Sequence, residues 1–548
     1  MPSSEPLQIF TYQTRLDSDA FTDEAMESFA KLFGKVERKL FAAIASGKNA
    51  TDLKSSFQKE YGITARQFNA IRVQLEGKIA SFTEKRAGQI VTMQQKIASV
   101  QSTVKKLQKR APHSEKCHQK KRLQFNLENR LAKLKQDESS GRISLCFGSK
   151  RLFRAQFALA ANGYDNQAEW LRCWKQSRDD SFFLLGSKDE SSGNQSCTAT
   201  IAEDGSLSLR IRLPDALLKK YGKYLTLSGI HFQYGHQNII AALQSCERRK
   251  QLQALKDPQG RSSGLPISYR FKCDQKGWRI FVSVPVAKSH PATSSQKGVI
   301  GVDINADHLA FAETDRFGNP IAKKSIPLTT YGKNRNQAKA LIGKTCTALI
   351  AYAKQRGKTL VIENLDFRKK KAELKEYAHP AYARMLSSMA YTQIKGHLKA
   401  KGWREGVEVV EINPAFTSLI GRIKFARRYG LSIHQSAALA IGRRHLRVSE
   451  KIPRRLEAIP DGKEGFVAFS LPVRNREKHV WSIWRILGRK LKTALAAHFR
   501  AIANRSMSSQ PASVISNIPE YVGETPTRES VNTTARLACL NSSTDICV

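Results

Sequence analysis

Two short apolar segments, each carrying an acidic residue at or near its end, constrain this chain more than any other feature. Residues 298–305 contain Asp303, and residues 359–363 end in Glu363. A helical pattern over 336–355 separates them, so that strands and a helix alternate as they do in an α/β domain. A carboxylate inside an apolar strand is unfavourable unless a cation or hydrogen bonds compensate its charge.

Asp303 and Glu363 therefore predict a candidate catalytic metal site. At the ends of neighbouring strands the two carboxylates would form a hard, oxygen-rich site for Mg²⁺ or Mn²⁺. Paired divalent ions of this kind activate a water and stabilise the leaving oxygen during phosphodiester cleavage. The alternative is a pair of strand-end acids that contact basic residues.

The charge balance of the chain indicates a polyanionic partner. Lysine and arginine number 91 against 47 acidic residues, which gives a formal net charge of +44. Such an excess repels itself in the compact state, and a nucleic acid compensates it. The rival partner is an anionic membrane, but we find no run of about 18 apolar residues and no signal-peptide pattern. We expect nucleic acid and no membrane, with a cytoplasmic, nucleoid-associated location.

Hydrophobic periodicity divides the chain into five segments. They are 1–17, the first strand of a β-rich domain; 18–140, a helical segment; 141–292, the rest of the β-rich domain; 293–505, an α/β domain; and 506–548, a disordered tail rich in Ser, Thr, Asn and Pro. The expected fold class is therefore multidomain α+β.

Within the helical segment, apolar residues spaced by three and four predict a long amphipathic helix that breaks at Pro112 and returns as an antiparallel partner. Its lysine-rich faces are typical either of a solvated surface or of one that contacts nucleic acid. In the β-rich domain, alternating segments flanked by turn residues predict hairpins in a β-barrel or a small set of packed sheets.

The order of motifs after residue 300 resembles that of TnpB proteins, transposon-encoded ancestors of the type V CRISPR effectors. Asp303 stands within GVDIN, followed by NADHLA and DRFGNP, and Glu363 stands within VIENLDF. A strand and the sequence PAFTS (414–418) come next, where the family has P-x-x-T-S. Residues 433–442 then resemble the third motif, D-x-N-A-A-x-N-I. The resemblance covers roughly residues 8–503.

This resemblance implies a specific layout and activity. It implies that 18–140 is a helical recognition segment, that 141–292 is a β-barrel-like wedge domain, and that 293–505 is an RNase H-like (RuvC) domain. The implied function is that of a transposon-encoded, RNA-guided DNA endonuclease. Its partners would be a guide RNA encoded near its own gene and both double-stranded and single-stranded DNA. Mg²⁺ or Mn²⁺ would be the cofactor.

The third motif departs from the family, because His434 stands where an aspartate is expected. His434, Ala438 and Ile441 share one helical face, which predicts that His434 lies near a helix start and points at the sheet. A neutral imidazole favours Mn²⁺ over Mg²⁺. His434 is thus either a third catalytic metal ligand or a packed polar residue in a degenerate site. Two further functions stay open: a nuclease-inactive, RNA-guided DNA-binding repressor, and a transposition accessory protein that binds DNA without guide RNA.

A second departure concerns zinc. The family carries a four-cysteine zinc finger before the third motif, whereas residues 419–428 contain no cysteine, so we expect no zinc finger. A basic stretch occupies this region instead. Phosphate contact or a solvated surface would explain it. The candidate nucleic-acid-binding residues are Arg422, Lys424, Arg427, Arg428, Arg443 and Arg444.

Overall fold

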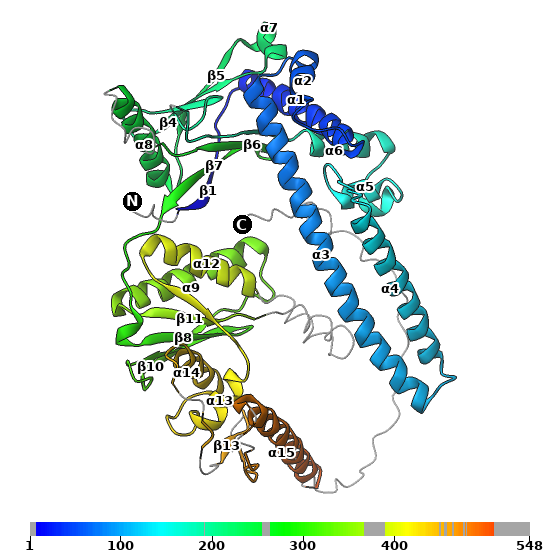
Figure 1. Cartoon of the computed structure of the whole chain (residues 1–548), viewed down its shortest axis with the longest axis vertical. Coiled ribbons are helices and arrows are strands. Elements are labelled where there is room, and N and C mark those ends of the chain that lie inside the picture. The colour runs from blue at the N-terminus through cyan, green and yellow to red at the C-terminus, as the bar shows by residue number, and fades with distance from the viewer. Residues whose placement is uncertain are drawn as a thin grey trace, which may run out of the picture. The chain divides into compact units, whose positions relative to one another are not determined.

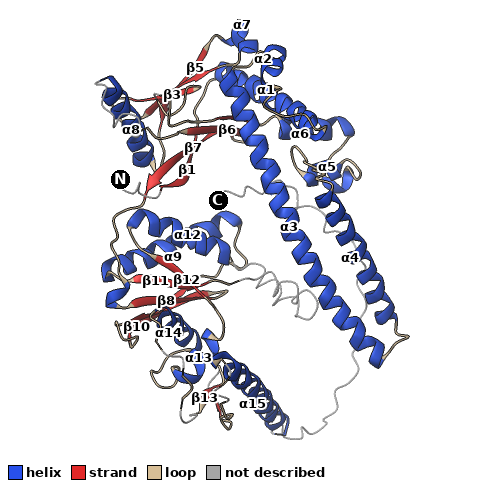
Figure 2. Ribbon diagram, viewed as in Figure 1, coloured by secondary structure: helices blue, strands red, loops and turns tan. Residues whose placement is uncertain are grey.

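The computed structural model describes most of the chain in two compact units (Figure 1). The described residues are 7–190, 192–254, 264–365, 390–448, 451–453, 458–462, 465–474, 477 and 479–508. Those up to His290 form the first unit, and those from Pro291 onward form the second. Both units mix helices and strands, as Figure 2 shows, in agreement with the expected α+β class.

Four helices open the first unit after its first strand. They are α1 (Ala20–Ala45), α2 (Lys54–Tyr61), α3 (Ala65–Arg110) and α4 (Glu115–Ser139). Thr64 begins α3 with a capping box, in which its hydroxyl accepts from the Gln67 amide and the Gln67 side chain accepts from the Thr64 amide. α3 packs along α4, so the predicted long helix and its antiparallel partner are confirmed.

The apolar stripe of α3 is buried against α4 as its spacing predicted. The buried members are Ile90, Met93, Ile97, Val100 and Val104. Leu123 on α4 is 41 % exposed, so the stripe on this second helix is less complete than the sequence suggested.

The strands of the first unit form two sheets. The four-stranded sheet has the order β1 (Leu7–Arg15), β7 (Gly277–Ala287), β6 (Ser268–Asp274) and β2 (Ser181–Leu184). The three-stranded sheet has the order β3 (Cys197–Ile201), β4 (Leu207–Arg212) and β5 (Tyr224–Ile230). All neighbouring strands are antiparallel, and β1 pairs with β7 along its full length.

The core of this unit joins the helices to both the four-stranded and the three-stranded sheet. Phe182 of β2 stacks between Phe29 of α1 at 4.3 Å and Phe271 of β6 at 4.7 Å, measured between ring centroids. All three rings are buried. Aromatic stacking of this kind adds to the stabilisation that area burial provides.

The sequence left open a β-barrel or a small set of packed sheets, and the described strands form the second of these, as two separate open sheets. Helices also interrupt the segment that we expected to be β-rich. These are α5 (Lys150–Ala155), α6 (Gln167–Arg178), α7 (Leu218–Tyr221) and α8 (His236–Ala254). α5 and α7 are too short to show a helical period, so the strand pattern on either side of them dominated the prediction.

The second unit is built on a five-stranded mixed sheet. Its order is β10 (Pro320–Pro327), β9 (His308–Thr314), β8 (Val299–Ile304), β11 (Thr359–Glu363) and β12 (Val409–Ile412). β8, β9 and β10 form an antiparallel meander. β11 runs parallel to β8, and β12 runs parallel to β11.

Helices cover both faces of this sheet (Figure 2). α9 (Arg335–Arg356) and α12 (Tyr391–Glu405) pack together on one side, and α14 (Ile433–His445) crosses the other side with α13 (Thr417–Lys424) beside it. The described chain ends with two further elements. They are an antiparallel pair of two-residue strands, β13 (Ile459–Pro460) and β14 (Phe466–Val467), and the helix α15 (Val480–Ser508). α15 extends three residues past the expected domain end at 505, and the remainder of the expected tail (509–548) lies outside the described residues.

Small residues let α14 approach the sheet closely. A Cβ atom at Gly301 of β8 would overlap the carbonyl oxygen of Ala438 and lie 2.6 Å from the amide nitrogen of Gly442. Ile441 of α14 packs beside them against Val299 and Val361. The first turn of α14 is thereby brought to the end of β8.

Candidate active site

Asp303 and Glu363 lie beside each other at the ends of two parallel strands. The register of β8 with β11 pairs Gly301 with Val361 and Val302 with Ile362, so Asp303 and Glu363 are the next pair along. Both residues are buried, at 7 % and 6 % exposure. The sequence expectation that two strand-end carboxylates become neighbours agrees with this register.

Both carboxylates belong to the sheet face that α14 covers. Side chains alternate along a strand, so Asp303 shares a face with Gly301, whose Cα faces α14. Glu363 shares a face with Val361, which packs against Ile441 of α14. The first turn of α14 therefore lies over the two acids. Its partly positive N-terminus favours negative charge there.

His434, in that first turn, contacts Asp303 directly. Its Nδ1 atom lies 3.0 Å from Asp303 Oδ2, and the Asn305 side-chain amide donates to the same carboxylate oxygen at 3.0 Å. Ser432 caps the helix through a capping box with Gln435, which fixes where the turn begins. The predicted orientation of His434 toward the sheet is confirmed by this contact.

The Asp303–His434 pair is electrostatic as well as geometric. The hydrogen bond to Asp303 raises the pKa of His434 above its ordinary value, the negative charges of Asp303 and Asp307 act in the same direction, and burial opposes them. The ring of His308 packs edge-on against that of His434, with centroids 4.8 Å apart. The imidazole side chain is 47 % exposed, so one edge of it faces solvent.

Glu363 is held from a different element. The Thr417 hydroxyl at the start of α13 contacts the Glu363 carboxylate and lies 3.0 Å from the Pro414 carbonyl oxygen. The residue before it, Phe416, adopts a left-handed backbone conformation with φ of 62°, which is rare for a bulky side chain. Its ring packs edge-on against Trp481, and this turn presents Thr417 to the acid.

The donor atoms suit a divalent cation, but the three predicted ligands do not form a complete cluster. Carboxylate oxygens of Asp303 and Glu363 are the hard donors that Mg²⁺ and Mn²⁺ prefer. Among the described residues, no group of three His, Cys, Asp or Glu side chains is placed to hold a metal ion. In this structure His434 directs Nδ1 at Asp303, which leaves Nε2 as the nitrogen able to bind an ion.

Sequence reasoning missed three residues of this site. Asn305 holds Asp303, Thr417 holds Glu363, and His308 packs against His434. All three stand inside motifs already singled out, but only as parts of a pattern. Carboxylates that bind a metal commonly accept hydrogen bonds from nearby polar side chains. A polar residue shortly after a strand-end acid, such as Asn305 after Asp303, is therefore a signal that a sequence analysis can use.

Four of the six predicted nucleic-acid-binding residues donate to backbone carbonyl oxygens in the structure. The contacts are Arg422 to Pro460 at 2.8 Å, Lys424 to Lys451 at 2.7 Å, Arg443 to Gly318 at 2.6 Å and Arg444 to Asn413 at 2.6 Å. Burial lowers the pKa of Arg422 and that of Arg443 below the usual value for arginine. Arg427 and Arg428 are exposed.

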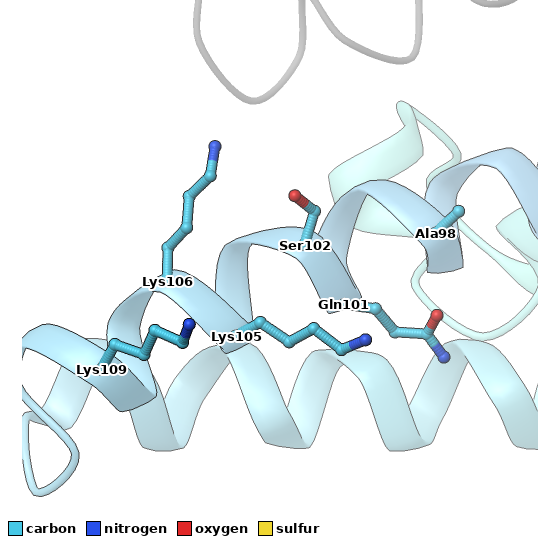
Figure 3. A pocket seen from close by; sticks show the side chains of 6 residues that line it. All are labelled: Ala98, Gln101, Ser102, Lys105, Lys106 and Lys109. Atoms are coloured by element: carbon cyan, nitrogen blue, oxygen red, sulfur yellow. The ribbon is translucent and has the colours of Figure 1, made fainter.

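A second basic surface lies on α3 in the first unit. A shallow hollow there is lined by Ala98, Gln101, Ser102, Lys105, Lys106 and Lys109, whose arrangement Figure 3 shows. The sequence from 85 to 110 contains no acidic residue. The three lysines of this hollow would suit a phosphate backbone.

No described helix has both the length and the apolar character that crossing a membrane requires.

Comparisons with known proteins found structural likenesses and no sequence relative. No protein-family model matches the chain, and no curated protein matches it. Among solved structures, it is similar to Cas12f1 in a complex with guide RNA and target DNA at 12 % identity and a TM-score of 0.29, over 80 % of this chain and 99 % of that one. It is also similar to a Cas12i1 R-loop complex at 10 % identity and a TM-score of 0.26, over 72 % and 57 % of the two chains.

T. thermophilus RuvC bound to a Holliday junction substrate is similar at 14 % identity and a TM-score of 0.19, over 26 % of this chain and 88 % of that one. Every one of these TM-scores is below 0.5, so we draw no functional conclusion from them.

Proposed function

We propose that this chain is a TnpB-like, transposon-encoded DNA endonuclease that cleaves under RNA guidance through a RuvC-type metal site in residues 293–505. The observation that carries the proposal is the pairing of Asp303 and Glu363, buried side by side at the ends of parallel strands β8 and β11. The mixed sheet with helices on both faces supports an RNase H-like assignment for this region.

Each residue of the proposed site has a distinct task. Asp303 and Glu363 would hold Mg²⁺ or Mn²⁺, which when bound supplies activation of a water and stabilisation of the leaving phosphate oxygen. Asn305 fixes the Asp303 carboxylate, and Thr417 fixes that of Glu363. His434 orients Asp303 through Nδ1 and offers Nε2 toward the solvent-exposed side. Binding through one ring nitrogen while a carboxylate holds the other is a common arrangement for ligating histidines.

The basic surfaces support the nucleic-acid half of the proposal. In RNA-guided recognition, base pairing reads the sequence, while the protein contacts the backbone and a short flanking DNA motif. Arg427 and Arg428 are exposed in the unit that carries the site, and Lys105, Lys106 and Lys109 line the hollow on α3. We assign these residues to phosphate contacts with a guide RNA encoded near the gene and with its DNA target.

A second candidate function is RNA-guided DNA binding without cleavage. The observation that favours it is the bond between His434 and Asp303, because the imidazole already occupies a carboxylate oxygen that a metal ion would otherwise bind. A nuclease-inactive protein of this kind would occupy its target and repress it.

The test is purification of the chain from a host that carries its native locus, followed by sequencing of the bound RNA and plasmid cleavage with Mg²⁺ and with Mn²⁺. Asp303→Asn should abolish cleavage and leave the bound RNA unchanged. Glu405→Gln is the matched control, since this carboxylate is 51 % exposed and belongs to α12, on the sheet face opposite α14.

Each outcome assigns one function. A discrete RNA with guided cleavage establishes the nuclease. A discrete RNA with guided DNA binding but no cleavage under either ion establishes the inactive, repressing protein. Purification without any specific RNA overturns both and favours a transposition accessory protein that binds DNA alone.

A further inference from the structure

The segment that contains α5 and α6 exposes aromatic rings in an unusually basic setting. Phe157 is 78 % exposed and Phe153 is 44 % exposed, and their rings meet edge-on with centroids 6.3 Å apart. We call these two rings the aromatic platform. Large apolar side chains left in solvent together are characteristic of a surface that another molecule covers.

The aromatic platform stands on a small core of its own. Trp170 and Trp174 of α6 stack with centroids 6.1 Å apart, and Phe153 lies against Trp174 at 5.5 Å. The Trp170 indole donates to the Leu152 carbonyl oxygen at 2.7 Å, which fastens α6 to α5. Phe157 is thus the exposed end of a row of aromatic rings that continues through Phe153 and Trp174 to Trp170.

Cationic side chains lie beside the aromatic platform on α5. Residues 141–164 contain no acidic residue. Lys150, Arg151 and Arg154 are exposed on α5, and none forms a salt bridge to another described residue. Exposed rings flanked by unpaired cations can stack nucleobases while the cations contact the phosphates.

We propose that the aromatic platform, with Lys150 and Arg154, binds unpaired nucleotides of an RNA strand. The inference rests on the proposed function only for the choice of RNA, the single strand that such a protein carries throughout its cycle. Stacking requires no particular base, because every base has a π-face. A duplex does not fit, since its bases are stacked on one another and do not reach the rings.

The first test is binding of a labelled 12-nucleotide oligouridine to the full chain, stripped of nucleic acid and kept free of divalent ions. Phe157→Ala should weaken binding about five-fold or more, the loss expected from removing one stacked base. Phe157→Trp should retain affinity and Phe157→Leu should lose it, because leucine keeps the apolar surface without the ring. Arg154→Gln should instead make the binding affinity less dependent on salt concentration, by the amount expected for the loss of about one phosphate contact.

The matched control is Tyr234→Ala. Tyr234 is 73 % exposed, and residues 224–247 around it contain neither lysine nor arginine. We expect this variant to bind oligouridine like the wild type. Phe157 has so little buried surface that none of its variants should shift the thermal unfolding midpoint.

The second test locates the contact. Oligouridine carrying a photoreactive base should cross-link to the tryptic peptide 155–172, which contains Phe157, and not to the peptide that contains Tyr234. Absence of this cross-link, or full affinity in Phe157→Leu, overturns the proposal. A Phe157→Ala variant that loses self-association but keeps oligouridine affinity also overturns it, in favour of a second copy of the chain. Because these measurements use no metal and no target DNA, they stand whether or not the chain cleaves DNA.

Discussion

His434 Nδ1 lies 3.0 Å from Asp303 Oδ2, so a hydrogen bond joins the first turn of α14 to the end of β8. The bond joins the residue that departs from the expected motif to the residue on which the proposed metal site depends. Its strength in the absence of metal decides whether a cation can compete for Asp303.

We expect His434→Asp to increase metal dependence. The substitution replaces the balancing imidazole by a third carboxylate beside Asp303 and Glu363, so the metal-free protein should be destabilised by like-charge repulsion. Saturating Mg²⁺ should then restore stability, by about 2.7 kcal/mol at one hundred times the dissociation constant. Thermal unfolding with and without Mg²⁺ measures this, and His434→Gln serves as the uncharged control. An unchanged Mg²⁺ response in His434→Asp would contradict placement of the third ligand at this position.

The stability contributed by His434 should depend on pH. Because Asp303 raises the pKa of His434, the pair stabilises the fold fully below the unfolded-state pKa of about 6.5 and loses this contribution as pH rises through the folded-state pKa. The unfolding midpoint of the wild type should therefore exceed that of His434→Gln by more at about pH 5.5 than at about pH 8.5. In the Asp303→Asn background this excess at low pH should be reduced, because the largest cause of the raised pKa of His434 is removed; an undiminished excess would assign the titration to another group.

Thr417 should contribute to metal binding and cleavage through its hydroxyl group alone. Thr417→Val keeps the shape of the side chain but leaves Glu363 without this partner, and loss of such a supporting contact typically reduces metal affinity or activity about 10- to 100-fold. Thr417→Ser should retain most of the activity. Guided cleavage measured against Mn²⁺ concentration separates weaker metal binding from a lower rate. Equal activity of the valine and serine variants would show that the contact has no role.

Much of the α/β unit was predictable because its signals are local. Asp303 and Glu363 interrupt apolar strands, and their neighbouring positions follow from strand and helix order. The face shared by His434 and Ile441 follows from helical spacing. The contact of Thr417 with Glu363 was not predictable, because it follows a left-handed backbone conformation at Phe416. Such a conformation is usually signalled in a sequence by glycine, and here the residue is phenylalanine.

The basic residues show a different limit of sequence reasoning. Arg443 and Arg427 belong to the same charged stretch, yet Arg443 donates to the Gly318 carbonyl oxygen while Arg427 remains exposed. A sequence does not indicate which arginine will donate to a backbone carbonyl oxygen that is distant along the chain. Similarly, Trp170 and Trp174 lie on one face of α6, but they build a separate small core inside a segment whose flanks read as strands.

Replacing Gly301 of β8 by alanine should destabilise the protein. Gly301→Ala would place its Cβ against the Ala438 carbonyl oxygen and the Gly442 amide, both of which are backbone and cannot turn aside. α14 would have to move away from the sheet, at a cost of about 1–3 kcal/mol in stability, and His434 would move with it. Chemical denaturation measures the first effect, and guided cleavage or metal binding measures the second.

Gly343→Ala in α9 is the matched control for Gly301→Ala, since no atom lies within 4 Å of the added carbon. A helix-interior Gly→Ala change should stabilise the protein by about 0.5–1 kcal/mol. The two variants should therefore shift the denaturation midpoint in opposite directions. If Gly301→Ala proved neutral, α14 would not be packed as closely on β8 as the bond between His434 and Asp303 requires.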